Sequence, residues 1–204
     1  MAWNPNKPYH PPHYYADNCF YFITARTFNR RQIWRSDAAK RIFVTELQSA
    51  IQDYDIPLYA WAILHEHHHM LIYVEKKPQL VLFIKRLHGA SAIQINKQGR
   101  TSGRKVWYNY WDYCPRDDRD FYRVFNYIHI QPIKHGILPM PGGLSPGPVD
   151  TYETSIEGVP ELHELLAQYE FTSYRYYARK HGLDGMVNVW LDYPIPRSWE
   201  GDTF

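Results

Sequence analysis

The stretch PLYAWAILHEHHHMLIYVE, residues 57–75, decides the fold. It holds two runs rich in aromatic and branched apolar residues, PLYAWAIL and HHHMLIYVE. Runs of this kind separated by a short polar step predict two antiparallel strands, joined here by a tight turn near residues 65–66. Neighbouring side chains of a strand point to opposite faces. We therefore expect His67 and His69 to project together and His68 to point away.

The remaining elements surround this hairpin. The spacing of apolar and capping residues predicts a strand at 18–27, a helix after the capping residue Ser36 as far as about Ile51, a helix from Pro78 to about Lys97, and a strand at 106–113. The order strand, helix, strand, strand, helix, strand is that of the split βαβ arrangement. We expect an α+β fold, a ferredoxin-like split βαβ antiparallel sheet with helices on one face and the other face left free.

A third helix is predicted in DDRDFYRVFNYIHIQ, residues 117–131, because its apolar residues recur at helical spacing. Pro132 is expected to end it. A Pro/Gly-rich connector starts at residue 139 and precedes a last helical stretch at about 160–181. The chain then divides into an extended N-terminal arm (1–17), a catalytic domain (18–138), and a connector with an acidic C-terminal helical tail (139–204).

Charge is distributed unevenly along the chain. The segment 84–135 carries 10 Lys/Arg and 4 Asp/Glu, a net charge of +6, whereas 136–204 carries 4 against 10, a net charge of −6. A basic segment in a chain with 17% aromatic residues is typical of contact with a polyanion, although a solvated basic face gives the same count. The two cysteines fit no disulfide framework, and neither an export signal nor a membrane span is visible, so we expect a cytoplasmic protein.

The histidines acquire a candidate partner on the third helix. Two imidazoles on one face of a strand can share a metal ion, but surface or core histidines also occur in such clusters. Tyr127 and Gln131 are four residues apart and lie on the same helix face, at the edge of the apolar stripe. The amide oxygen of Gln131 could complete a ligand set with His67 and His69. An ordinary half-buried tyrosine and a plain helix end remain the alternatives.

These segments also resemble a known family. HHH, followed by GRKVWYNYWDY and then YIHIQPIKHGIL, is similar to the REP-associated tyrosine transposases, members of the single-tyrosine HUH transposase class. The resemblance runs from about Cys19 through YEFTSYRYYARKHGL and covers most of the chain. It implies that Tyr127 is the catalytic nucleophile, that His67, His69 and Gln131 hold a divalent metal ion, Mg²⁺ or Mn²⁺, and that the helix of residues 117–131 is the catalytic helix added to the sheet.

The chain departs from the family pattern in three places. The residue between the two histidines is usually hydrophobic, and here it is His68. The residue before the motif is commonly Asn and is Glu66, and the residue before the proline is commonly Asn and is Gln131. The glutamine keeps the amide chemistry with a longer reach.

The resemblance implies cleavage and rejoining of single-stranded DNA through a covalent 5′-phosphotyrosine, at hairpin-forming repeats. Single-stranded or hairpin DNA would be the partner, and no membrane partner is expected. Both a homodimer and a monomer are compatible with the sequence. A non-enzymatic nucleic-acid-binding module with an RNA-binding-domain-like sheet is the first alternative, and a metal-dependent hydrolase using activated water is the second. The basic segment and the aromatic strand supply the residues expected to bind DNA: Lys85, Arg86, Lys97, Arg100, Arg104, Lys105, Trp107 and Trp111.

Overall fold

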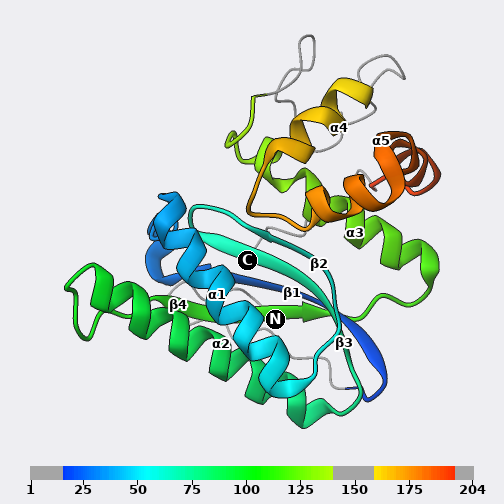
Figure 1. Cartoon of the computed structure of the whole chain (residues 1–204). Helices are drawn as coiled ribbons and strands as arrows, with labels where there is room; N and C mark the ends of the chain where they lie inside the picture. The colour runs from blue at the N-terminus through cyan, green and yellow to red at the C-terminus, as the bar shows by residue number, and fades with distance from the viewer. Residues whose placement is uncertain (1–15, 140–158, 196–204) are drawn as a thin grey trace, which may run out of the picture.

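A four-stranded antiparallel sheet forms the centre of the structure, a computed structural model that describes residues 16–139 and 159–195 (Figure 1). The strand order β2-β3-β1-β4 is that of the expected ferredoxin-like arrangement. The expected α+β fold class is thereby confirmed. The strands are β1 (Cys19–Thr27), β2 (Leu58–Ile63), β3 (His67–Val74) and β4 (Trp107–Tyr113).

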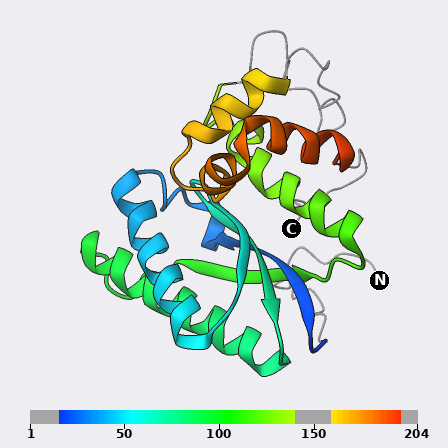
Figure 2. The ribbon, with the colours of Figure 1, turned by 45° about the vertical axis from the view of Figure 1, so that its right-hand side comes forward.

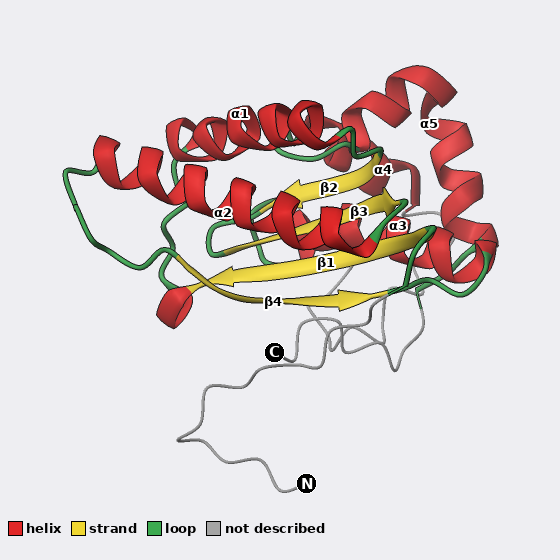
Figure 3. Ribbon diagram, turned by 90° about the horizontal axis from the view of Figure 1, so that it is seen from below, coloured by secondary structure: helices red, strands yellow, loops and turns green. Residues whose placement is uncertain are grey.

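Two long helices cover one face of the sheet (Figure 3). They are α1 (Asp37–Tyr54) and α2 (Lys77–Gln98), and a short 3-10 turn, η1 (Phe28–Arg30), precedes α1. The predicted cap is present, since the Ser36 side chain accepts a hydrogen bond from the Ala39 amide at 3.2 Å. Apolar residues of both helices pack against alternate residues of the strands and form the first core.

The other face of the sheet also carries helices, contrary to the expectation that it is free. α3 (Asp118–Lys134) packs on β2 and β3, and α4 (Val159–Gln168) and α5 (Tyr174–Asp192) pack on α3 (Figures 1 and 2). The reason is the apolar stripe of α3, which needs a partner on each side. Its inner side meets Phe22 and Leu71, and its outer side meets apolar residues of the two C-terminal helices in a second core.

The helix α3 continues past Pro132 to Lys134, so the prediction that Pro132 ends it is wrong by most of a turn. Proline removes one amide donor, but a proline near the end of a helix leaves most of the hydrogen bonds intact. The His135 amide donates to the Gln131 carbonyl at 3.0 Å, and the Ile137 amide donates to the Pro132 carbonyl at 2.8 Å. These bonds complete the final turn.

The C-terminal part contains two helices where the sequence predicted one stretch at 160–181. The intervening residues bind the free edge of β2. The Ile63 amide donates to the Phe171 carbonyl at 3.0 Å, and the Ser173 amide donates to the Trp61 carbonyl at 3.0 Å, around an antiparallel bridge at Thr172. The segment between α4 and α5 therefore extends the sheet by a few residues.

Two expected segments fall on residues outside the described ranges. These are the N-terminal arm, apart from its last two residues, and most of the Pro/Gly-rich connector. The domain boundaries stay predictions. In the part of the chain that the structure describes, no helix is long and apolar enough to cross a membrane.

The middle histidine of the motif lies in the first core, as strand alternation predicts. His68 is fully buried, and its ring lies 4.8 Å from the Phe43 ring. Its Nε2 lies 2.9 Å from Nε2 of His88 on α2, so one imidazole donates and the other accepts. Burial lowers the pKa of His68 well below the usual value and that of His88 to about 3. Both rings are therefore neutral at pH 7.

We expect stability to fall on acidification. Both folded pKa values lie below the ordinary 6.5, so the unfolded chain takes up protons that the folded chain does not. The contribution of these two histidines to the free energy of unfolding is complete above about pH 6.5. Below that pH it decreases by about 1.4 kcal/mol per pH unit and per histidine. Urea unfolding at pH 7.5, 6 and 5 measures this slope. The double variant His68→Leu/His88→Leu should have a shallower slope, whereas the exposed control His181→Leu should not; equal slopes in all three proteins would contradict this account.

Candidate active site

The two outer histidines of the motif lie together at the start of β3, on the face that carries α3. Their ring centroids are 4.9 Å apart. Thr24 pairs with His69 across β1 and β3, and its Oγ1 lies 2.8 Å from Nδ1 of His69. This contact fixes the orientation of the ring and makes Nε2 the nitrogen that can bind a metal ion. The predicted separation of His67 and His69 from His68 is confirmed by these contacts.

Tyr127 and Gln131 occupy successive turns of α3 above these histidines. The Tyr127 ring lies 5.8 Å from the His69 ring, and Phe22 of β1 contacts both, stacked on His69 at 5.6 Å and edge-on to Tyr127 at 5.9 Å. None of the Tyr127 surface is exposed, so the alternative of a half-buried tyrosine does not apply. Tyr127 therefore lies beside His69, which lies beside His67, and Gln131 follows Tyr127 by one turn of the same helix.

The amide of Gln131 is oriented by its own helix. Its Nε2 donates to the Tyr127 carbonyl at 3.1 Å, while its buried Oε1 has no hydrogen-bond partner among the described residues. A buried acceptor without a donor is costly, and a cation would satisfy it. No three His, Cys, Asp or Glu side chains within 16–139 and 159–195 form a cluster that could hold a metal ion. Two imidazoles with this amide oxygen fit a divalent ion, and the amide is needed for a third ligand.

Sequence reasoning missed two residues next to this group, Lys134 and His135. The Lys134 ammonium donates to the Tyr127 hydroxyl at 3.2 Å, and the exposed His135 ring lies 4.5 Å from the His67 ring. Lys134 follows Tyr127 by seven residues, two helical turns, which would have indicated a shared face. The predicted helix end at Pro132 hid that relation. Because Lys134 is half-buried and His135 exposed, the site meets solvent at this end of α3.

Comparison with known proteins agrees with this geometry. A sequence profile described as "Transposase IS200 like" matches residues 15–131, which is more than half of the 204-residue chain. The matched segment begins just before β1 and ends at Gln131, so it contains His67, His69, Tyr127 and Gln131. The chain belongs to the IS200-like transposase family.

Solved structures extend the likeness to the fold. A REP-associated tyrosine transposase, solved in complex with a REP hairpin, is similar with a TM-score of 0.60 and 16% identity, over 96% of this chain and 93% of that chain. A transposase from Deinococcus radiodurans aligns with 20% identity over 60% of this chain and 98% of its own, but its TM-score of 0.42 is too low to carry an argument. No curated protein matches. The resemblance read from the sequence is confirmed by the family and by the shared fold.

The basic residues of this IS200-like chain separate into two groups. Lys97, Arg100 and Lys105 are exposed around the loop between α2 and β4. Because Arg26 pairs with His67 and Thr27 with Trp107, this loop leads into the end of the sheet that carries His67. These cations are therefore positioned to contact the backbone of a DNA strand that enters the site, a role that stays a prediction.

The other basic residues have different surroundings. Arg86 binds Glu46 at 3.0 Å and Asp53 at 3.1 Å, and thereby joins α2 to α1. Arg104 donates to the Asn96 side chain at 2.9 Å. Lys85 is exposed on α2, on the face of the sheet opposite Tyr127. The DNA contact predicted for Lys85 and Arg86 has no support from proximity to the site, whereas Arg104 shares the α2–β4 loop with Arg100 and Lys105 and its side chain is bound by Asn96.

The aromatic residues of β4 are also divided. Trp107 is 7% exposed and stacks on His88 at 4.7 Å in the first core, so a base-stacking role does not fit its burial. Trp111 is half-buried on the opposite face, parallel to Tyr113. A register shift between Ala25 and Thr27 in the β1–β4 pairing inserts the extra residue that turns Trp107 and Trp111 to different faces. Only Trp111 lies on the side of the candidate site.

We expect the ion pairs of Arg86 to stabilise the folded chain. Removing its side chain in Arg86→Ala leaves Glu46 and Asp53 unpaired at the α1–α2 interface and should lower the free energy of unfolding by about 1 kcal/mol, a value typical of a partly exposed ion-pair network. Chemical denaturation measures the change. The neighbouring substitution Lys85→Ala, at an exposed position, is the matched control and should stay within about 0.5 kcal/mol of the parent. Equal losses in both variants would be inconsistent with this assignment.

Proposed function

We propose that the chain cleaves and rejoins single-stranded DNA, with Tyr127 as the nucleophile. The observation that carries the proposal is the contact between a phenol on α3 and a pair of imidazoles on β3, with an amide one helical turn from the phenol. Tyr127 lies beside His69, and Gln131 is held one turn further along α3. A covalent mechanism splits one difficult displacement into two reversible steps. Membership in a transposase family supports this reading.

In the first step, the phenolic oxygen of Tyr127 attacks the phosphorus of a phosphodiester. A bond forms between this oxygen and phosphorus, and the bond from phosphorus to the 3′ oxygen breaks. The phenol gives up its proton to solvent as it attacks, and the leaving 3′ oxygen takes up one proton, so the products are a 5′-phosphotyrosine and a free 3′ hydroxyl. Rejoining reverses these steps with a 3′ hydroxyl as the attacking group, so no external energy source is needed.

His67, His69 and Gln131 would hold the divalent ion that the family implies. When bound, the ion supplies Lewis-acid neutralisation of the phosphate charge. Thr24 orients His69 through Nδ1, which is the usual function of a residue behind a metal-binding histidine. Mg²⁺ or Mn²⁺ remains our proposal for the ion, whereas imidazole ligands alone would also suit Zn²⁺.

Lys134 stabilises the attacking oxygen. Its ammonium group donates to the Tyr127 hydroxyl at 3.2 Å, and a cation at this position favours negative charge on the phenol. An ammonium already carries its proton, so Lys134 is a donor to the nucleophile and not the base that deprotonates it. It therefore acts as an electrostatic partner of Tyr127.

A local movement must precede attack. Tyr127 is fully buried beneath Phe22 and His69, and a phosphate can reach its oxygen only after the last turns of α3 shift or the side chain rotates. The solvent-exposed end of the site, marked by His135, is the place where this opening costs least. The described state is thus a resting state of the proposed enzyme.

Single-stranded DNA is the proposed substrate, and hairpin-forming repeats are its proposed source. A similar fold has been solved with a REP hairpin, and we transfer that partner to this chain as a proposal. The exposed cations of the α2–β4 loop lie at the entrance and would neutralise phosphates on either side of the cleaved bond.

The adduct tests the proposal. The chain is incubated with 3′-end-labelled single strands and Mn²⁺, then denatured and resolved by electrophoresis, because the 5′-phosphotyrosine retains the fragment with the original 3′ end. We expect label on the protein, with none for Tyr127→Phe and none when EDTA removes the metal. Tyr54→Phe, which alters a tyrosine of α1 on the opposite face of the sheet, is the matched control and should retain the adduct. Cleaved DNA without an adduct would favour a hydrolase that activates water, and binding without cleavage would favour a non-enzymatic module.

Removal of the Lys134 ammonium should slow the chemical step. We expect Lys134→Met to form the adduct about 10-fold to 1000-fold more slowly under single-turnover conditions, the usual effect of losing one donor to a developing anion. Lys134→Arg should recover part of the rate. Affinity for the strand should be nearly unchanged. If the salt dependence of binding instead lost about one charge while the rate at saturation stayed the same, Lys134 would be a phosphate contact.

A further inference from the structure

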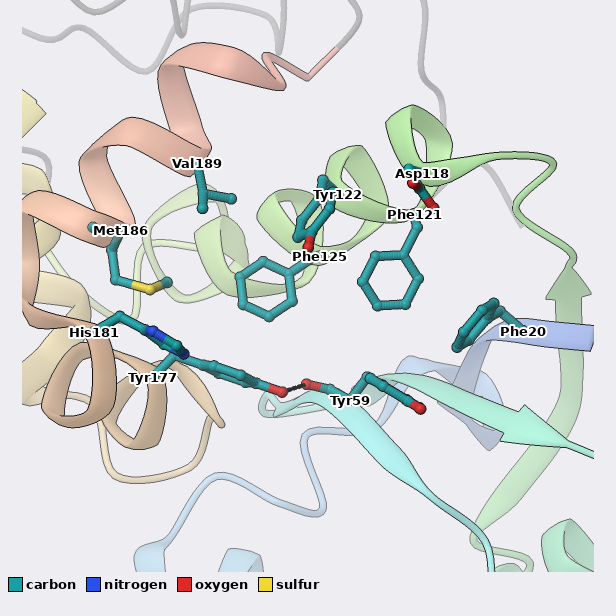
Figure 4. A pocket seen from close by; sticks show the side chains of 11 residues that line it. Phe20, Tyr59, Asp118, Phe121, Tyr122, Phe125, Tyr177, His181, Met186 and Val189 are labelled. Atoms are coloured by element: carbon teal, nitrogen blue, oxygen red, sulfur yellow. Dashed lines mark hydrogen bonds between the residues drawn. The ribbon is translucent and has the colours of Figure 1, made fainter.

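An aromatic pocket of about 570 Å³ lies between α3, α5 and the strands of the sheet, outside the group of catalytic residues (Figure 4). Its opening faces solvent, and its walls come from parts of the chain that are distant in sequence. Figure 4 shows rings from α3 on one side and from α5 and β2 on the other, with Met186 and Val189 closing one end. The six aromatic rings of the lining are Phe20, Tyr59, Phe121, Tyr122, Phe125 and Tyr177.

The rings contact one another around the pocket. Phe20 packs edge-on to Phe121 at 4.9 Å and to Tyr59 at 5.2 Å. Tyr177 packs edge-on to Phe125 at 4.9 Å and donates its hydroxyl to the Tyr59 carbonyl. Edge-to-face contacts hold rings in fixed orientations, so the lining offers ring faces and edges in fixed positions to an aromatic guest.

The pocket and the catalytic residues share one face of β1. Same-face residues of a strand are two positions apart, and Phe20 lines the pocket while Phe22 contacts both His69 and Tyr127. Thr24, the next on this face, holds His69. Four residues of strand separate Phe20 from Thr24, a length of about 13 Å. The pocket therefore lies on the same face of the sheet as Tyr127, towards the N-terminal end of α3, and the movement of α3 that admits a phosphate to Tyr127 would also let the strand run on to the pocket.

Two charged side chains bear on what the pocket can hold. Lys180 is exposed on α5 and lines a neighbouring hollow of about 460 Å³ that shares Tyr59 and Tyr177 with the pocket. This cation can contact a phosphate while a ring enters the pocket. At the mouth, the exposed Asp118 presents a carboxylate beside Phe121, as Figure 4 shows. A carboxylate accepts hydrogen bonds from exocyclic amines and repels a carbonyl edge.

We propose that this pocket binds one unpaired base of the DNA strand that is cleaved, and that it prefers a base with an exocyclic amine over thymine. The inference rests on the proposed function, because the strand reaches the pocket by way of the catalytic residues. The pocket would hold the strand in register, so that one particular phosphate lies at Tyr127. Base contacts of this kind specify a sequence, whereas phosphate contacts only position the strand.

Photo-cross-linking tests the location of the base. The Tyr127→Phe chain, which cannot form the adduct, is mixed with single strands that carry 5-iodocytosine at one position each, irradiated, and mapped by peptide mass spectrometry. We expect one position to cross-link to Phe121, Tyr122 or Phe125. The absence of any cross-link to these residues from a strand that binds would overturn the proposal. Because no cleavage is required, this outcome is separate from failure of the adduct assay.

A cycle of substitutions tests the energetic role of the pocket. Val189→Trp would fill the space from α5, and an abasic site at the cross-linking position would remove the guest. Each change alone should weaken binding about 5-fold to 150-fold, the range for one stacked base, and the two together should weaken it no further. Val81→Trp, at an exposed position of α2, is the matched control and should bind normally. Tyr122→Leu provides a milder variant should Val189→Trp unfold.

Independent effects of the two changes would overturn the proposal, as would a change in oligomeric state in place of the loss of binding, since that would identify a second copy of the chain as the occupant. For specificity, thymine at the cross-linking position should bind less tightly than cytosine to the parent protein. Asp118→Asn should reduce that difference. A preference that survives Asp118→Asn unchanged would contradict the role given to the carboxylate.

Discussion

The alternation of side chains along the first three residues of β3 is the constraint on which the site depends. His67 and His69 face α3, and His68 faces α2, because neighbouring residues of a strand point in opposite directions. A slip of one residue would exchange the two sets. Both sides resist this slip. Thr24 holds His69 on one face, and His88 holds His68 on the other, where the His68 ring also packs against Phe43 and Trp107.

The position of Tyr127 depends in turn on residues far along the chain. The helix that carries it lies between the sheet and the C-terminal helices. Asn126, the neighbour of Tyr127, donates to the Val189 carbonyl at 3.1 Å and to the Tyr193 carbonyl at 2.9 Å, and His129 contacts Ser173 at 2.7 Å. The outer side of α3 is thus held by hydrogen bonds to α5, while its inner side presents the phenol to His69. The C-terminal helices are part of the support for the nucleophile.

Local patterns were sufficient for much of this architecture. Strand alternation predicted that His67 and His69 share a face, and helical spacing predicted that Tyr127 and Gln131 lie one turn apart, and both relations are present. The ligand and nucleophile roles of these residues stay predictions. The local patterns failed where the deciding contact joins residues that are distant in sequence. They also failed where a single residue, such as a proline in a helix or an extra residue in a strand, alters the expected pattern. Lys134 was missed because a proline was taken as the end of a helix that it does not end.

The same lesson applies to the aromatic strand and to the C-terminal part. No pattern within WYNYWDY reveals the shift in the β1–β4 pairing that turns Trp107 and Trp111 to opposite faces, because a bulge is a property of two strands. Likewise, the break between α4 and α5 arises from hydrogen bonds to β2, more than 100 positions earlier in the chain. The pocket between α3 and α5 could not be inferred from the sequence for the same reason, since its walls come from β1, β2, α3 and α5.

The short bridge at Thr172 has a consequence for solubility. β2 is the outer strand on its side of the sheet, and an uncovered outer strand offers its amides and carbonyls to the same strand of another molecule. Residues 171–173 occupy these groups along the C-terminal half of β2, at residues 61–63. A chain shortened before this segment would expose both the strand edge and the apolar side of α3, and would tend to assemble into intermolecular sheets. The C-terminal part thus also protects the molecule against aggregation.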